Sequence, residues 1–304
     1  MEQLLTRVTG RRDALASPDL AHLIDGAQSY VTSWGPLDSE RYQVGFNASR
    51  ITSELTRLNW PVWSAERPLT LLWIAVDFGN GQRALMGEML ADEGLAPEIV
   101  DFMQSLRMEL DTAASERGLP IVYPLLDLPD QQALGFAEVW GGFDGLIERA
   151  SQRYNPDAEL VGRIAVTDFG LEVRWTLLQN GRSQALLATT VREGVDWLAD
   201  QYAAEFSIVG GARMTRIAVL DVDSLAAYGR VMSHLESLSV LRSVDVEGFD
   251  GTTLNLRVAA RGDDRVIERV LTLGGLLVPA SAGDASSAST STLSFRLADS
   301  GTQQ

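Results

Sequence analysis

The chain has 304 residues and a formal net charge of −16, and it contains no cysteine. All 25 of its basic residues are arginine, because lysine occurs at no position. This composition excludes Schiff-base, phosphate-loop lysine and thiol chemistry, together with disulfides and thiolate-bound metals. Such an acidic surface also repels phosphate backbones and anionic lipids, so we expect no nucleic acid partner.

The first 65 residues predict a truncated αβα unit, whose first helix looks like the end of a longer one. That helix stops at Gly10, and Ser17-Pro18 then opens a second helix with a serine cap. Residues 41–46 alternate as a strand does, and Asn47 is suited to cap the helix that follows. No apolar run reaches the roughly 18 residues of a membrane span, and no signal peptide precedes these elements.

Residues 66–210 predict a mixed-sheet α/β domain. The continuous apolar run at 69–76 is typical of a strand that is buried on both faces. Apolar residues at spacings of three and four predict a helix over 97–117, and a short strand is expected at 121–126. Three antiparallel strands follow from 159 to 190, and Thr190 with Glu193 forms the sequence pattern of a capping box.

Trp175 lies in the second of those three strands. Val173 and Leu177 share its face, whereas Glu172, Arg174 and Thr176 alternate onto the other face. The pattern predicts that Trp175 is a buried, structural residue.

Residues 211–298 predict a ferredoxin-like βαββαβ domain. A strand, a helix, two strands and a second helix follow in order, and either 275–279 or 292–298 can supply the last strand. The small-residue segment 281–291 between them is expected to be a flexible insert, and 299–304 to be a tail. The predicted fold class is therefore α/β (α+β).

The most reactive-looking motif is Asp221-Val222-Asp223, which follows a hydrophobic strand. An Asp-x-Asp in this position resembles the nucleophile motif of haloacid-dehalogenase-like phosphatases, which are metal-dependent hydrolases. Those enzymes also need a later lysine or arginine and a further acidic pair on a larger sheet. The favoured interpretation is that Asp223 or Ser224 caps the next helix.

Four carboxylates cluster around Trp140 between residues 127 and 144, namely Asp127, Asp130, Glu138 and Asp144. Carboxylates beside an aromatic ring can bind a sugar or a cation. A loop of turn residues around one anchoring tryptophan explains the segment more simply, with Asp144 as the cap of a helix over 145–153.

Two other candidates are weaker. Arg11-Arg12 can hold an anion, although a solvated loop is the favoured interpretation. The two histidines, His22 and His234, have no histidine or carboxylate partner at helical spacing. We therefore expect no metal and no cofactor.

Five strings, read together, resemble the proteobacterial family called domain of unknown function 2066, over residues 4 to 279. They are Arg7-Val8-Thr9-Gly10-Arg11-Arg12-Asp13, Pro61-Val62-Trp63 with Glu66-Arg67-Pro68, Pro124-Leu125-Leu126-Asp127, Trp140-Gly141-Gly142-Phe143 and Leu160-Val161-Gly162-Arg163. Members commonly carry a signal peptide, so the resemblance implies the periplasm. Because this chain begins without one, the cytoplasm is the alternative localisation. The family has no established activity and so implies no catalytic residues.

Residues 68–206 are also similar to the amino-terminal domain of the periplasmic Tol-system β-propeller protein, through 156–163, Trp175, Asn180-Gly181 and the helix around Asp196. That likeness implies a protein-contact module. We therefore predict a non-catalytic, cell-envelope protein-interaction module with a protein partner. The alternatives are a small-molecule-binding regulatory protein and a metal-dependent hydrolase that uses Asp221 and Asp223.

Overall fold

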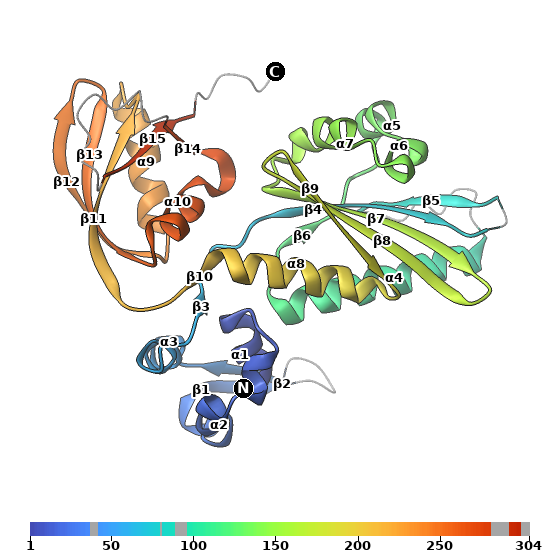
Figure 1. The fold of residues 1–304 in the computed structure, drawn as a ribbon, viewed down its shortest axis with the longest axis horizontal. Coiled ribbons are helices and arrows are strands. Elements are labelled where there is room, and N and C mark those ends of the chain that lie inside the picture. The colour runs from blue at the N-terminus through green and yellow to red at the C-terminus, as the bar shows by residue number, and fades with distance from the viewer. Residues whose placement is uncertain (37–41, 80, 89–95, 281–291, 299–304) are drawn as a thin grey trace. The chain divides into compact units, whose positions relative to one another are not determined.

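The structure is a computed structural model, which describes residues 1–36, 42–79, 81–88, 96–280 and 292–298. It is an α/β protein with mixed sheets, as the sequence predicts (Figure 1). The chain forms two compact units, one of Met1–Glu66 with Tyr202–Gln304 and the other of Arg67–Gln201. The sequence predicts boundaries near residues 65 and 210, and so treats the N-terminal and C-terminal parts of the first unit as separate domains. The predicted insert 281–291 and tail 299–304 lie outside the described residues.

The N-terminal part of the first unit packs helices against the base of a two-stranded hairpin. Its elements are α1 (Glu2–Thr9), η1 (Asp13–Ala16), α2 (Pro18–Asp25), η2 (Ala27–Tyr30), β1 (Val31–Pro36), β2 (Tyr42–Phe46), α3 (Ala48–Arg57) and β3 (Val62–Trp63). Ser17 and Asn47 accept hydrogen bonds at the starts of α2 and α3, which confirms both predicted caps. Leu5, Leu20 and Leu55 are among the fully buried side chains of its core.

Two short strands join this part to the last part of the chain within the same unit. β3 pairs antiparallel with β10 (Ser207–Ile208), and the Ser239 hydroxyl donates to a Glu66 carboxylate oxygen over 2.8 Å. Gly10 is required here for two reasons, because its φ is +69° and a Cβ would lie 2.5 Å from the Trp63 ring. The glycine that ends α1 therefore also allows close packing on β3.

The C-terminal part contains the predicted strand and helix order with one addition. Its elements are β11 (Ala212–Leu220), α9 (Leu225–Ser237), β12 (Leu241–Asp250), β13 (Thr253–Arg261), α10 (Asp264–Thr272), η4 (Leu273–Gly275), β14 (Leu277–Pro279) and β15 (Thr292–Leu297). The sheet order is β12-β13-β11-β15-β14. Both segments that were candidates for the last strand join the sheet.

The added strand changes the ferredoxin-like pattern in a specific way. β15 pairs parallel with β11, and β14 pairs antiparallel with β15 at the edge of the sheet. β14 therefore runs antiparallel to β11, as the fourth strand of a βαββαβ unit does, but it lies one position further out. The result is a five-stranded mixed sheet rather than the four-stranded antiparallel sheet that the sequence predicts.

The second unit is built on a six-stranded mixed sheet. Its elements are β4 (Thr70–Asp77), β5 (Arg83–Met86), α4 (Pro97–Arg117), β6 (Ile121–Val122), α5 (Leu128–Ala133), α6 (Phe136–Gly141), α7 (Asp144–Ser151), η3 (Gln152–Tyr154), β7 (Ala158–Thr167), β8 (Gly170–Gln179), β9 (Arg182–Ala188) and α8 (Val191–Phe206), whose last residues belong to the first unit. The strand order is β5-β4-β7-β8-β9, with β6 also paired to β4. β4 is buried along almost its whole length, as the apolar run predicts.

Helices cover the two faces of this sheet unequally. α4 and α8 lie on one face and α5, α6 and α7 on the other (Figure 1). On the α8 face, Trp175 is fully buried, which confirms the prediction. A Cβ at Gly162 would lie 2.6 Å from its indole, and a Cβ at Gly194 of α8 would overlap it. Two glycines therefore create the space that this tryptophan fills.

Three local predictions in this unit were wrong. The segment predicted as a loop around Trp140 forms α5 and α6, each of which is too short to show apolar periodicity. The strand predicted over 121–126 ends at Val122. Phe143 rather than Asp144 is the N-cap of α7, and Asp144 is its first helical residue.

Candidate functional site

The β1–β2 hairpin carries large apolar side chains on one of its faces. Trp34 lies directly opposite Val44, and Pro36 lies opposite Tyr42. Because paired residues of an antiparallel ladder share a face, these four side chains lie on one side of the hairpin. We call them the apolar hairpin face.

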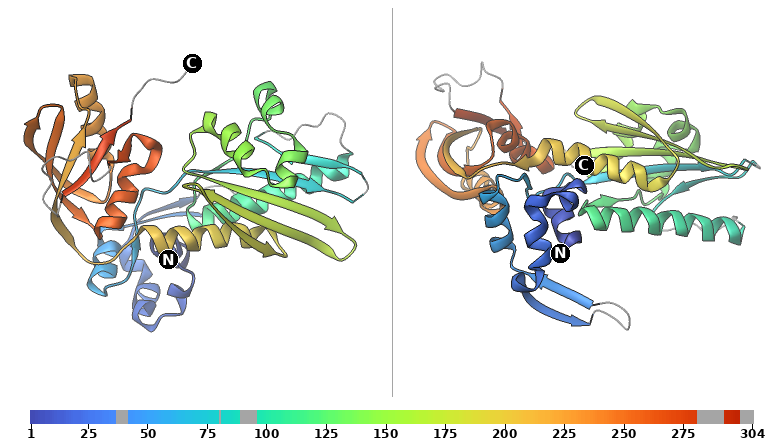
Figure 2. Two further views of the ribbon diagram at one scale, coloured as in Figure 1. Left: turned by 45° about the horizontal axis from the view of Figure 1, so that its top comes forward. Right: turned by 60° about the horizontal axis from the view of Figure 1, so that its bottom comes forward.

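The apolar hairpin face is strongly exposed. Trp34 is 75% exposed, Tyr42 is 67% exposed and Val44 is 43% exposed. The rings of Trp34 and Tyr42 lie 6.3 Å apart at 37°, a tilted diagonal pair. Figure 2 shows the hairpin projecting from the helices of its own domain. Large apolar side chains that share an uncovered face mark an interaction site more often than scattered ones do.

The opposite face of the hairpin has a different chemistry. Ser33, Gly35, Gln43 and Gly45 occupy it, again as directly opposed pairs. No side chain among these four is apolar or charged. The hairpin therefore presents two unlike surfaces, of which the apolar one is suited to a partner and the other to water.

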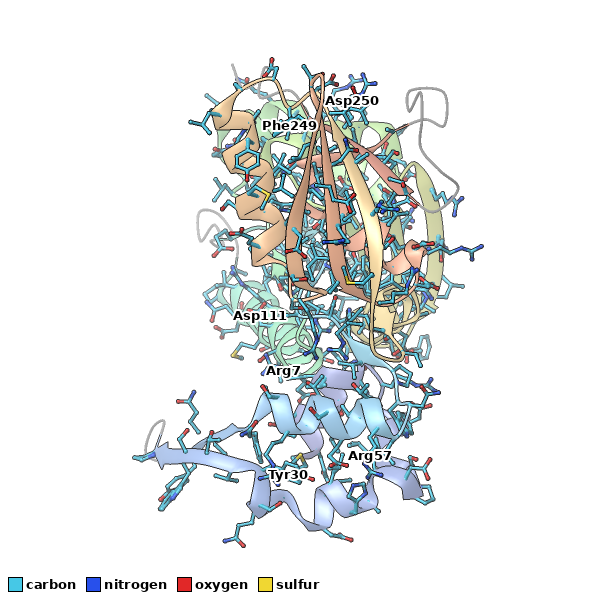
Figure 3. All side chains as sticks on the ribbon, turned by 90° about the vertical axis from the view of Figure 1, so that its left-hand side faces the viewer. Arg7, Tyr30, Arg57, Asp111, Phe249 and Asp250 are labelled. Carbon is cyan, nitrogen blue, oxygen red and sulfur yellow. The ribbon has the colours of Figure 1, made fainter. Side chains whose placement is uncertain are left out.

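The base of the hairpin is firmly attached to the helical core. Tyr30 is buried between the helices (Figure 3), and its carbonyl accepts a hydrogen bond from the Asn47 N–H over 2.8 Å. The Arg50 guanidinium lies 4.9 Å from the centroid of the Tyr30 ring. Phe46 packs on the core, so the apolar stripe continues from the core through Val44 to Tyr42. A two-stranded hairpin alone is marginally stable, and this anchoring supplies the support.

The structure does not bring the predicted candidates into one site. Asp221 and Asp223 are both exposed, and the buried Val222 separates them. Asp221 directly follows β11 with a left-handed φ of 64°, and its carboxylate lies 3.4 Å from Arg296 of β15. Ser224 is the residue that caps α9, because its hydroxyl accepts from the Ala227 N–H.

Trp140 and Asp144 lie near each other, at the end of α6 and the start of α7. Trp140 is half-buried and stacks on Phe136, with ring centroids 5.4 Å apart and an 18° interplanar angle. Asp144 is partly exposed, and its charge acts favourably on Arg163 of β7. Of these two candidates, Trp140 lines a pocket on the sheet, together with Arg163.

Of the two neighbouring arginines, Arg11 already has a carboxylate partner. Arg11 pairs through both ends of its guanidinium with the Asp13 carboxylate, which lowers the pKa of Asp13. Arg12 is exposed at the start of η1. The ion pair with Asp13 therefore neutralises the charge of Arg11, one of the two arginines.

The histidines have no shared environment. His22 is exposed, and a ring nitrogen of His234 lies 3.1 Å from the Leu271 carbonyl. Among the described residues, no group of three or more histidine, aspartate or glutamate side chains is arranged to hold a metal ion. In the same part of the chain, no helix combines the length and the apolarity that crossing a bilayer requires.

The sequence did not predict that two charged side chains, Arg117 and Asp130, are buried. Arg117 is 1% exposed and binds Asp196 over 3.0 Å and Asp200 as well, which ties α4 to α8. Asp130 is also 1% exposed and accepts from Tyr154 over 2.5 Å and from Arg153 over 2.9 Å. Neither burial has a signal in the sequence, because the charged or hydroxyl partners Asp196, Arg153 and Tyr154 all lie more than 20 residues away along the chain.

The apolar hairpin face was missed for another reason. The alternation of residues 42–46 predicted the strand correctly, but alternation does not show whether a face is covered. The one signal was that Tyr42, Val44 and Phe46 share a side while no second strand of comparable length was predicted beside them.

The comparisons with known proteins match the domain that carries this hairpin. A family described as a domain of unknown function (DUF8605) matches residues 1–64. No curated protein and no solved structure matches the chain significantly. The matched family covers the α1–β3 segment, including both strands of the hairpin.

Proposed function

We propose that this chain is a non-catalytic protein-interaction module that binds its partner through the apolar hairpin face. The observation that carries the proposal is the exposure of Trp34 and Tyr42 on one side of an anchored hairpin. Tryptophan and tyrosine are enriched among the residues that dominate binding energy in protein interfaces.

The energetics favour a protein groove as the complement of this face. Burying most of a tryptophan side chain that is now in water contributes roughly 2–4 kcal/mol. None of the four side chains of the apolar hairpin face is charged, so their burial leaves no unpaired charge. An extended apolar groove on a partner protein is therefore the surface that fits best.

We further propose that the module acts in the cell envelope, in the periplasm. This part of the proposal rests on the resemblance of residues 4–279 to domain of unknown function 2066. The likeness of 68–206 to a Tol-system contact domain supports a role in protein contact.

Site-specific photo-crosslinking in the native host tests the proposal. A photoreactive phenylalanine analogue is placed at Trp34 or Val44, and, as matched controls, at Ser33 or Gln43 on the opposite face. We expect a discrete protein adduct from the first two positions and none from the controls. Affinity of the purified partner for the Trp34→Ala chain should fall by roughly 30-fold or more, as expected for an interface anchor.

Two outcomes would contradict the proposal. Equal crosslinking from both faces would show that the hairpin is not a specific contact surface. Binding of the purified chain to neutral phosphatidylcholine vesicles, lost in Trp34→Ala, would assign the apolar hairpin face to a membrane surface instead.

A further inference from the structure

A pocket lies on the sheet of the second unit, far along the chain from the hairpin. Its volume is about 430 Å³, within the rough range of 300–1,000 Å³ that small-molecule sites occupy. The pocket lies over β7, β8 and β9, on the sheet face that α5, α6 and α7 cover in part. Its lining includes Trp140, Arg163, Leu171, Glu172, Arg174 and Leu187.

Two arginines lie directly beside each other in this pocket. Arg163 of β7 lies directly opposite Arg174 of β8, and like charges in that position are destabilising. Glu172 lines the same pocket and the charge of Asp144 acts on Arg163, but among the described residues no carboxylate forms an ion pair with either guanidinium. An anion between them would remove this repulsion.

Arg163 is held in place but not fully satisfied. One terminal nitrogen donates to the Thr176 hydroxyl over 2.8 Å. The Nε of Arg163 is buried, and the described residues offer it no hydrogen-bond partner. Burial, and then the charge of Arg174, lower the pKa of Arg163, against the opposing charge of Asp144. A carboxylate oxygen is the strongest acceptor for such a group.

The remaining walls of the pocket are largely apolar. Leu187 lies opposite Arg174 on the edge strand β9 and is 73% exposed. Leu171 and the stacked ring of Trp140 add to the same lining. Glu172 lies one row away, opposite Ala165, so the pocket holds two cationic groups against one carboxylate.

We infer that this pocket binds a small organic carboxylate with an apolar body. The carboxylate lies between Arg163 and Arg174, and the apolar body lies against Leu171, Leu187 and Trp140. This site is independent of the apolar hairpin face, because it belongs to the Arg67–Gln201 unit.

Isothermal titration calorimetry with 4-phenylbutyrate tests the inference on the full chain. The amide 4-phenylbutyramide has nearly the same shape and no charge, so it isolates the contribution of the carboxylate. Arg174→Gln is the main variant, because Arg174 is exposed, and Arg163→Gln is the second. Arg182→Gln is the matched control, because Arg182 is an exposed arginine at the start of β9 outside the pocket lining.

We expect saturable binding of 4-phenylbutyrate that is about tenfold or more weaker in Arg174→Gln and unchanged in Arg182→Gln. The affinity of the wild-type chain for 4-phenylbutyramide should be no higher than the affinity of Arg174→Gln for 4-phenylbutyrate. Circular dichroism and the melting temperature show whether each variant is folded. Absence of binding at 10 mM probe, on the order of the weakest specific sites, would overturn the inference. Equal affinities for acid and amide, or for wild type and a folded Arg174→Gln, would also overturn it.

Discussion

Trp34 and Trp175 both lie on strands that pair antiparallel with a neighbour, but their surroundings are opposite. Trp175 is fully buried between Gly162 of β7 and Gly194 of α8. Trp34 is 75% exposed on the apolar hairpin face. The difference lies in the helices, because α8 covers Trp175 on β8, whereas no described helix covers Trp34 on β1. A buried tryptophan stabilises the fold, whereas an exposed one is available to a partner.

The largest expected effect is that of Trp175→Ala. Removing a fully buried indole leaves a cavity and costs roughly 3–5 kcal/mol of unfolding free energy. Chemical denaturation of the purified chain measures this change. A loss below about 1 kcal/mol, within the range of surface substitutions, would show that α8 does not pack on the strand as the structure shows.

Arg117→Ala tests how the covering helices are held together. The substitution leaves Asp196 and Asp200 without their buried partner, so we expect a loss of about 3 kcal/mol. Arg57→Ala removes an exposed pair with Glu54 on α3 (Figure 3) and should cost less than about 0.5 kcal/mol. Similar losses in the two variants would contradict the account of Arg117.

Gly194→Ala isolates the close approach of α8 to Trp175. The added methyl group overlaps the indole, so the variant should lose about 1–2 kcal/mol even though alanine favours helices. Gly229→Ala on α9 is the matched control, because nothing lies within 4 Å of its Cβ position. That control should gain up to about 1 kcal/mol. The opposite signs of the two changes are the diagnostic result.

The partly buried carboxyl group of Glu159 on β7 should make the stability of the protein depend on pH. Burial, and then the nearby charge of Glu148, raise the pKa of Glu159 to about 7, against a hydrogen bond from Ser151. The folded state therefore holds a proton that the unfolded state releases near pH 4.5, so stability falls as pH rises from about 4.5 to 7.

Glu159→Gln should remove this loss. The variant should exceed wild type by about 1–2 kcal/mol at pH 8, after allowance for the partial exposure of Glu159, and match it near pH 4.5. Denaturation at the two pH values gives both differences. A constant offset between variant and wild type would show that Glu159 does not titrate in this window.

The sequence predicted what depends on neighbours along the chain. The helix over 97–117, the caps at Ser17 and Asn47 and the burial of Trp175 all follow from local spacing or capping, and the structure confirms them. The parallel insertion of β15 beside β11 was not predicted, because it depends on pairing between strands that are distant in the sequence.

Less of the candidate site than of the fold could be predicted from the sequence. Alternation identified the strand at 42–46. The exposure of Tyr42 and Val44, in contrast, depends on whether another element of the fold covers that face of the strand. The juxtaposition of Arg163 and Arg174 follows from the register of β7 and β8, which places the two like charges opposite each other on one face. Both sites result from tertiary arrangement rather than from a motif.

Complementation of a gene deletion by Trp34→Asp tests the central claim most directly. Trp34 contributes little to stability, since an exposed cross-strand pair is worth roughly 0.2–1 kcal/mol. The account predicts a variant with nearly the wild-type melting temperature and abundance that fails to complement, whereas Gln43→Asp on the opposite face complements fully. Full complementation by a folded Trp34→Asp chain would contradict the claim that the apolar hairpin face is the functional surface.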